Sequence, residues 1–342
     1  MLFVPVSGEF GMGEYARSLA IAQAAGRRWP QAEIHFVLSS QALYAKTLPF
    51  AATLLDSSPT FHSAAVARLI KQFKPSIVIF DNAGRTAQLR AARRHGARIV
   101  FISSRARQRR KAFRWRWMRL LDEHWIAYPQ FVAGDFTWME RFKLERMGKP
   151  TVRYLDVILA RTPVEHESML PRAALKPGGF VLVVPGGGTG HPGVQDAAGQ
   201  FLSAANVLAE SDTVVYVGPP GSSGPRLRCF NSLPQADLAD LMRGARLVVT
   251  NGGSTLLQAI ACGCACIAVP IAKDQPQRIA RCVDAGVAVT AELTAESIVR
   301  AAVKLLRDET ARAALAQRAS ALKLANGIEI ALNALVHLSE TA

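Results

Sequence analysis

The sequence predicts an α/β protein with two doubly wound domains, each a parallel sheet between layers of helices. The chain has 342 residues, about twice the usual length of one domain. Half of the residues are apolar, and short apolar runs alternate with amphipathic stretches, as in repeated β-α units. Between about residues 148 and 178 this pattern is interrupted by prolines and a Gly-Gly pair, after which it begins again. We therefore expect two Rossmann-like domains.

The first half is expected to contain four strands, at 2–6, 34–38, 77–80 and 99–102, and helices at 13–25, 63–73 and 86–95. The second half repeats the pattern, with strands at 180–184, 213–217, 247–250 and 265–269 and helices at 194–209, 236–243 and 255–262. A helical tract follows at 296–338. We place the domains at 1–155 and 178–325, with a linker at 156–177 and a C-terminal helix at 326–342 that packs back on the first domain.

Charge divides the chain unevenly. The formal net charge is +15; residues 1–150 hold 24 Lys or Arg against 10 Asp or Glu, whereas the rest holds 17 against 16. A basic half beside a neutral half favours an anionic partner for the first domain: a membrane surface, an acidic glycan or a nucleic acid.

Several features exclude other classes of protein. The first ten residues lack a secretory signal, and no uninterrupted apolar stretch is long enough to cross a membrane. The five cysteines lack metal-ligand spacing, so we expect small buried thiols and no metal. We expect a cytoplasmic protein.

Ligands of doubly wound sheets bind beyond the carboxyl ends of strands, so the loops there are candidate sites. The first such loop runs from Ser7 to Glu14 and combines three glycines with two carboxylates. A carboxylate there suits a general base that acts on a hydroxyl. Glu14 could instead only stabilise the start of a helix through its dipole.

The second loop, P-G-G-G-T-G-H at 185–191, offers backbone amides to an anion. We expect Gly187, Gly188 and Thr189 to contact phosphate. His191 could contact phosphate or an acceptor, or be an ordinary loop residue.

The third loop follows the strand at 247–250 and is the most informative. Gly253, Ser254 and Thr255 combine amides and hydroxyls at a helix start, which suits a diphosphate. Gln258 lies one turn further on the same face, where it can reach a ribose. Asp274 and Gln275, after the next strand, offer hydrogen bonds to sugar hydroxyls.

Residues 249–278, V-T-N-G-G-S-T-L-L-Q-A-I-A-C-G-C-A-C-I-A-V-P-I-A-K-D-Q-P-Q-R, resemble the nucleotide-sugar motif of GT-B glycosyltransferases. The closest groups are the UDP-glycosyltransferases and the enzyme that makes lipid II, with H-G-G-x-x-[ST]-x-x-E-x-x-x-x-G-x-P and then D-Q. More weakly, G-M-G-E-Y-A-R-S-L-A-I-A at 11–22 is similar to their first loop, G-x-G-H-x-x-R-x-x-x-L-A. F-N-S-L-P at 230–234 resembles the segment that frames the base, through Asn231 and Ser232.

The resemblance implies two domains that face each other across a cleft, with an acceptor on the first and a nucleotide diphosphate-sugar on the second. UDP is the favoured nucleotide, and no cofactor is implied. Transfer in this family is usually inverting and metal-independent, because a helix start and hydroxyls stabilise the leaving diphosphate. A lipid-linked or anionic glycan acceptor, as in cell-envelope polysaccharide synthesis, fits the basic first half.

The sequence departs from the family at three positions. Asn251 stands in place of His, Gln258 in place of the ribose-binding Glu, and Glu14 in place of a catalytic His. Glu14 or Asp81, at the end of a strand, could be the base. Two alternatives therefore stay open: a nucleotide-sugar hydrolase or epimerase of the same fold, and a non-catalytic protein that binds a nucleotide sugar or a partner enzyme.

Residues 105–119 hold eight cationic side chains among aromatic ones. This composition is typical of a segment on an anionic membrane surface, here the inner face of the membrane, or of an anionic acceptor site. The expected contacts are Arg109, Arg110, Arg114, Trp115, Arg116 and Trp117. The alternative is a solvated basic face whose aromatic residues pack inward. No nucleic-acid-binding module accompanies the segment, so we do not expect nucleic acid.

Overall fold

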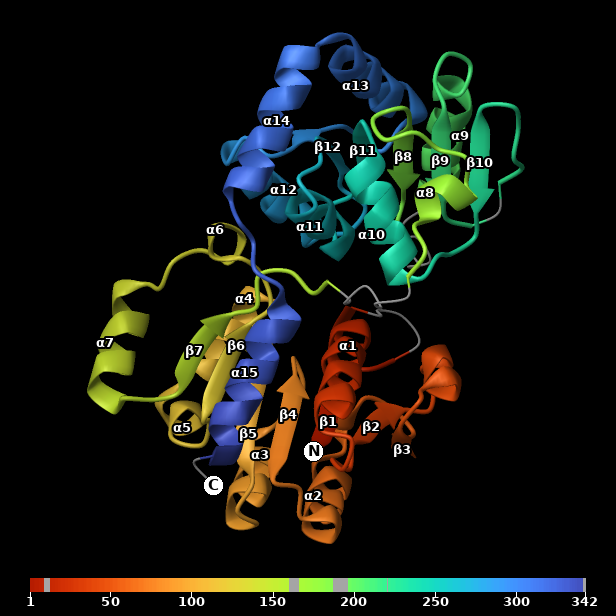
Figure 1. Cartoon of the computed structure of the whole chain (residues 1–342). Helices are drawn as coiled ribbons and strands as arrows, with labels where there is room; N and C mark the ends of the chain where they lie inside the picture. Colours follow the sequence, from red (N-terminus) through yellow and green to blue (C-terminus); the bar gives the residue numbers. More distant parts are fainter. Residues whose placement is uncertain (9–12, 160–165, 187–195, 220, 341–342) are drawn as a thin grey trace. The chain divides into compact units, whose positions relative to one another are not determined.

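The computed structural model describes residues 1–8, 13–159, 166–186, 196–219 and 221–340 (Figure 1). The chain forms two compact units. The first contains residues 1–158 and 325–342, and the second contains residues 159–324.

The first unit is a seven-stranded parallel sheet in the order β3-β2-β1-β4-β5-β6-β7. Its strands are β1 (Leu2–Pro5), β2 (His35–Ser39), β3 (Ala51–Leu55), β4 (Ile77–Asp81), β5 (Arg98–Ser103), β6 (Glu123–Ile126) and β7 (Thr151–Tyr154). Its helices are α1 (Gly13–Arg28), α2 (Ser63–Phe73), α3 (Thr86–Arg94), α4 (Ala106–Ala112), α5 (Trp115–Met118), α6 (Gln130–Ala133), α7 (Trp138–Met147) and α15 (Gly327–Glu340). Two short 3₁₀ helices, η1 (Leu43–Thr47) and η2 (Pro59–Phe61), lie in the connections.

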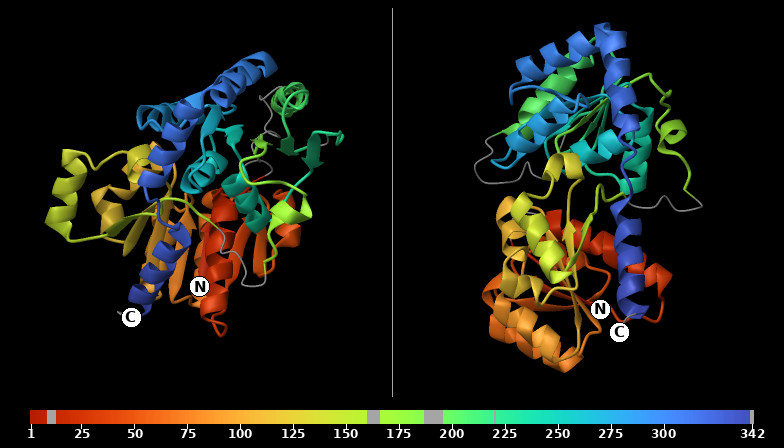
Figure 2. Two further views of the ribbon diagram at one scale, coloured as in Figure 1. Left: turned by 45° about the horizontal axis from the view of Figure 1, so that its top comes forward. Right: turned by 90° about the vertical axis from the view of Figure 1, so that its left-hand side faces the viewer.

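The two faces of this sheet are covered by different helices (Figure 2). One apolar cluster joins the sheet to α1 and α15, with Phe3, Ile21 and Leu335 among its members. The other joins it to α2, α3 and α5, with Val66, Leu89 and Trp117. Helix α15 thus completes the core of the first unit, since it packs against α1.

The second unit repeats this design with a six-stranded parallel sheet in the order β10-β9-β8-β11-β12-β13. Its strands are β8 (Val181–Val184), β9 (Val214–Val217), β10 (Leu227–Phe230), β11 (Leu247–Asn251), β12 (Cys266–Val269) and β13 (Val289–Thr290). Its helices are α8 (Met169–Arg172), α9 (Ala197–Leu208), α10 (Gln235–Gly244), α11 (Ser254–Ala261), α12 (Gln275–Asp284), α13 (Ala295–Arg307) and α14 (Glu309–Ala321). Phe201 of α9 and Ile298 of α13 belong to a core that covers one face of the sheet.

The strand order of both sheets is that of a doubly wound dinucleotide-binding fold, with one additional strand in the first. The α/β prediction is therefore confirmed. The predicted helical tract at 296–338 is three separate helices, because Asp308 caps α14 through its side chain and residues 322–326 are not helical. Within the described residues, no helix has the length and apolar character needed to cross a membrane.

Candidate functional site

Each sheet reverses its strand order once, between β1 and β4 in the first unit and between β8 and β11 in the second. Ligands of doubly wound sheets bind at this point because the loops that leave the two strands diverge. The two units are described in turn.

In the second unit, the Asn251 side chain joins two loops at this point. Its Nδ2 donates to the carbonyl of Pro185, just beyond β8, over 2.5 Å, and its Oδ1 accepts from the amide of Gly253 over 2.6 Å. Gly186 has a φ of +78°, and a Cβ there would lie 2.5 Å from Asn251 Nδ2, so the close approach requires glycine. Asn251 therefore has a structural role, because it joins the two loops. The predicted phosphate contact by the Gly253 amide needs correction, because that amide is already bonded to Asn251.

Helix α12 holds Gly252 from the other side. Gln275 Oε1 accepts from the amides of Gly252 at 3.2 Å and Ile271 at 2.8 Å, and Arg278 donates to the carbonyl of Gly252. A Cβ on Gly252 would lie 2.6 Å from Ile279, so packing requires glycine here as well. The sugar-binding role predicted for Gln275 is corrected in part: the side chain is buried, and its oxygen holds the loop.

These contacts fix the start of α11. The helix begins at Ser254 and lacks a side-chain cap among the described residues. Ser254 is exposed and Thr255 is half-buried. The amides of a first helical turn have no partner inside the helix, and the helix dipole places partial positive charge there. Two hydroxyls beside such amides form a site that can bind an anion.

The other predicted donor contacts lie elsewhere in the second unit. Gln258 is half-buried one turn along α11. The side chain of Asp274 is 59% exposed and pairs with Arg278 over 2.9 Å, which balances part of its charge. Asn231 and Ser232 are exposed beyond β10, three strands from β11, which is about 14 Å at the usual strand spacing.

The predicted contacts Gly187, Gly188, Thr189 and His191 lie outside the described residues. The cysteines of this unit are free thiols, and burial raises the pKa of Cys282 to about 12. In the described ranges, no three His, Cys, Asp or Glu side chains are grouped as metal ligands.

In the first unit, a polar cluster joins the start of α1 to the ends of β4 and β5. Asn82 Nδ2 donates to Glu14 Oε1 over 2.8 Å and to Ser104 Oγ over 2.5 Å, while Asn82 Oδ1 accepts from the Ser104 amide over 2.9 Å. Asn82 has a φ of +52°, which Asn adopts more readily than most residues. Arg105 Nη2 lies 3.3 Å from Glu14 Oε1. Two donors, Asn82 and Arg105, therefore hold the Glu14 side chain at the position predicted for a base.

Asp81, the other candidate base, is fully buried and bonded to α1. Arg17 donates to its two oxygens over 2.6 and 2.9 Å, and Ser18 donates to it over 3.3 Å. Burial raises the pKa of Asp81 to about 6, although the Arg17 guanidinium opposes the rise, so the carboxyl is ionised at neutral pH. We therefore correct the prediction for Asp81: its oxygens are used inside the protein, and it fixes α1 on β4.

Sequence reasoning missed Arg17, Asn82 and Ser104, and it assigned Arg105 only to the basic segment. A signal was present for two of them, because Asn82 and Ser104 directly follow strands, the same position that selected Asp81. Arg17 had a signal of another kind, because it matches the R of the first-loop motif G-x-G-H-x-x-R, but only the fold brings it to Asp81.

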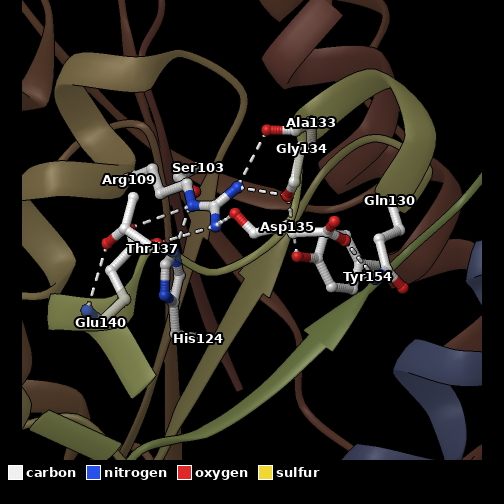
Figure 3. Close-up of polar contacts among 10 residues, drawn as sticks. All are labelled: Ser103, Arg109, His124, Gln130, Ala133, Gly134, Asp135, Thr137, Glu140 and Tyr154. Carbon is white, nitrogen blue, oxygen red and sulfur yellow. Dashed lines mark hydrogen bonds and ion pairs between the residues drawn. The ribbon is translucent and has the colours of Figure 1, made fainter. Parts of the chain in front are cut away.

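The basic segment forms α4 and α5, and two of its predicted surface contacts point inward. Arg109 binds Glu140 over 2.9 Å and donates to the carbonyls of Ala133, Gly134 and Asp135 over 2.8 to 2.9 Å (Figure 3). Trp117 is fully buried, and its Nε1 donates to Thr86.

Arg109 and Trp117 are therefore corrected: they stabilise the first unit and are not surface contacts. Arg110, Arg114, Trp115 and Arg116 are exposed.

The two doubly wound units define the GT-B fold, in which a chain forms two Rossmann-like domains. The sequence matches no protein-family model and no curated protein. Solved structures are similar over nearly the full length. The glycosyltransferase VinC in complex with dTDP has a TM-score of 0.69 and 14% sequence identity, and the match covers 100% of both chains. The glycosyltransferase SnogD from Streptomyces nogalater has a TM-score of 0.65 and 16% sequence identity, and the match covers 99% of both chains. A UDP-N-acetylglucosamine 2-epimerase is also similar, with a TM-score of 0.58 and 13% sequence identity; the match covers 100% of this chain and 96% of the epimerase. At such identities these similarities establish the fold.

Proposed function

We propose that the protein is a glycosyltransferase. Its second unit binds a nucleotide diphosphate-sugar, with UDP the favoured nucleotide, and its first unit binds an acceptor that is lipid-linked or an anionic glycan. The observation that carries the proposal is the start of α11, where Ser254 and Thr255 lie beside a loop fixed by Asn251, Gln275 and Arg278.

The two sites supply the two halves of an inverting transfer. The acceptor hydroxyl attacks the anomeric carbon while its proton passes to Glu14, and the bond from that carbon to the diphosphate oxygen breaks. The charge that develops on the leaving diphosphate is stabilised by the first-turn amides and hydroxyls of α11, which is the role a metal ion has in other transferases. This route is metal-independent.

Binding is tested by the thermal shift that UDP, GDP, dTDP and CMP conjugates produce. We expect a UDP conjugate to raise the melting temperature and Ser254→Ala/Thr255→Ala to abolish that rise. Thr310→Ala is the matched control, because it removes an exposed hydroxyl from the start of α14 in the same unit. An unchanged shift in the double variant would contradict the assignment of the donor site.

Turnover separates the transferase from a second candidate, an epimerase or hydrolase, which the similarity to a solved epimerase favours. Release of UDP that requires an acceptor supports the transferase. Release without acceptor supports the second candidate, and ligand binding without release supports a non-catalytic nucleotide-sugar-binding protein.

A further inference from the structure

Helix α7 presents large apolar side chains to solvent. The exposed fraction is 75% for Trp138, 51% for Phe142 and 40% for Met139. Trp138 and Phe142 are four residues apart and Met139 and Phe142 three, so the three side chains share one face of the helix. A group of neighbouring exposed apolar side chains on the surface of a globular unit marks an interaction surface.

This face does not result from a loosely attached helix. Glu140, on the opposite side of α7, forms a capping box with Thr137 and binds Arg109 through both oxygens. Arg109 also holds the carbonyls that precede the helix, and the Tyr154 hydroxyl donates to one of them, that of Gly134, over 3.0 Å (Figure 3). The protein therefore uses a buried ion pair to hold α7 in place, with its aromatic face outward.

Helix α5 extends the surface. Trp115 is 40% exposed, and Lys143 of α7 lies 5.9 Å from its ring centre and donates to the carbonyl of Phe113. Lys149, just beyond α7, donates to the carbonyl of Arg119, just beyond α5. The two helices are thus adjacent, and their aromatic residues belong to one region.

The same region is strongly cationic. Residues 105–149 hold 12 Lys or Arg against five Asp or Glu. Exposed arginines accompany the aromatic residues of both helices: Arg114 directly before α5, Arg116 on α5 and Arg146 on α7. We name Trp115, Trp138 and Phe142, with Arg114, Arg116 and Arg146, the α5–α7 surface.

We propose that the α5–α7 surface binds the surface of an anionic phospholipid bilayer. Tryptophan and phenylalanine side chains enter the boundary between headgroups and acyl chains, and arginines interact with the phosphates around them. A bilayer accounts for both properties, whereas a polyanion such as a nucleic acid would use the arginines and leave Phe142 and Met139 in water. The inference does not depend on nucleotide binding, and it assigns the contact to α5 and α7, not to Arg109 or Trp117.

The test is co-sedimentation of the full-length protein with vesicles at moderate salt. We expect binding to phosphatidylglycerol/phosphatidylcholine vesicles and at least tenfold weaker partition into phosphatidylcholine alone. Trp138→Ser/Phe142→Ser is expected to lower the partition coefficient by at least tenfold, and Arg114→Gln/Arg116→Gln/Arg146→Gln to lower it and weaken its dependence on salt. Each variant must keep the melting temperature of the parent, which separates lost binding from lost folding.

Matched controls come from the same unit. Phe61→Ser removes an aromatic residue that is 72% exposed, and Arg90→Gln/Arg94→Gln removes two exposed cations of α3. These variants are expected to sediment like the parent. The proposal is overturned if the parent stays in the supernatant with anionic vesicles, or if Trp138→Ser/Phe142→Ser sediments unchanged. Binding of an oligonucleotide that needs only the arginines, with no partition into vesicles, also overturns it in favour of a nucleic-acid site.

Discussion

The two units have the same strand order but place opposite chemistry at the point where it reverses. In the first unit, Glu14 and Asp81 bring two carboxylates there, each held by arginine or asparagine. In the second unit, the residues that end β11 and begin α11 are uncharged, and the loop is held by the amides Asn251 and Gln275. The topology thus fixes where a ligand is expected, and the side chains decide which kind.

The difference has a simple electrostatic meaning. Carboxylates beside a helix start repel a diphosphate but can accept a proton from a hydroxyl, whereas uncharged groups leave the positive potential of a helix start available to an anion. If this comparison holds, changes in the first unit should act on turnover or folding, and changes in the second on affinity for the donor.

The largest expected effect concerns Glu14. Glu14→Gln keeps the shape of the side chain and can still accept from Asn82, but it cannot take up a proton. We expect turnover to fall about 10²–10⁴-fold with donor affinity unchanged, measured by UDP release and by thermal shift. Parent-like turnover would exclude Glu14 as the base.

Arg17→Gln should destabilise the first unit without acting on the donor. It leaves the Asp81 carboxylate buried without its cation, which typically costs about 3–5 kcal/mol. The measurement is denaturant unfolding, with Arg27→Gln on the exposed side of the same helix as the control. Equal stability of the two variants would mean that the Arg17–Asp81 pair does not fix α1.

Asn251→Asp introduces into the second unit a carboxylate like those of the first unit. The carboxylate can still accept from Gly253 but can no longer donate to Pro185, and it lies beside the proposed diphosphate. We expect a loss of donor affinity of about tenfold or more, equivalent to about 1.4 kcal/mol, with a smaller loss in Asn251→Ala. Titration of the thermal shift with UDP measures both, and a larger loss in Asn251→Ala would contradict the electrostatic explanation.

The last prediction is a pH dependence in the first unit. Burial and the nearby Arg109 cation lower the pKa of His124 to about 3, so this ring stays neutral in the folded state while the unfolded chain protonates near its usual pKa of about 6.5. The neutral His124 ring makes its full contribution to the free energy of unfolding above pH 6.5. That contribution is lost as the pH falls below 6.5, by at most about 1.4 kcal/mol per pH unit.

His124→Gln should therefore have a shallower fall of melting temperature between pH 6.5 and 4.5 than the parent. Asp81 acts in the opposite sense, because its raised pKa lets the folded state take up a proton below about pH 6. Since Asp81 is present in both proteins, the comparison isolates His124. Parallel curves would contradict the prediction.

The sequence predicted the strands that are continuously apolar, such as β4, β5 and β11, because a parallel sheet buries both faces of each strand. It missed β6, whose residues Glu123 and His124 are polar yet buried. Arg153 of the neighbouring β7 and Trp125 Nε1 both donate to the buried Glu123 carboxylate, and Arg153 balances its charge. That Arg153 is the partner is known only once β6 and β7 are paired. A tertiary ion pair of this kind leaves no periodic signal.

The candidate sites were predictable to different degrees, because local motifs can be recognised in the sequence and contacts between distant residues cannot. Ser254 and Thr255 follow directly from a local motif, since a strand, a glycine loop and a helix start are consecutive in the chain. The internal roles of Asn251 and Gln275 depend on Pro185 and Gly252, which only the folded loops bring near. The basic segment predicted an anionic partner, but which of its residues face outward depends on Glu140, 31 positions after Arg109.

The packing of α15 on the first unit has a consequence for the order of biosynthesis. Asp156 accepts from the Ala325 amide, and a Cβ on Gly327 would lie 2.0 Å from the Leu155 carbonyl. The chain therefore re-enters the first unit beside residues 155 and 156, close to the point where it leaves that unit. A ribosome therefore completes the whole second unit before it supplies the apolar side chains of α15 to the first. Until then the apolar residues of α1 and of the sheet that pack against α15 stay exposed in the nascent first unit, and such exposed apolar surface promotes aggregation.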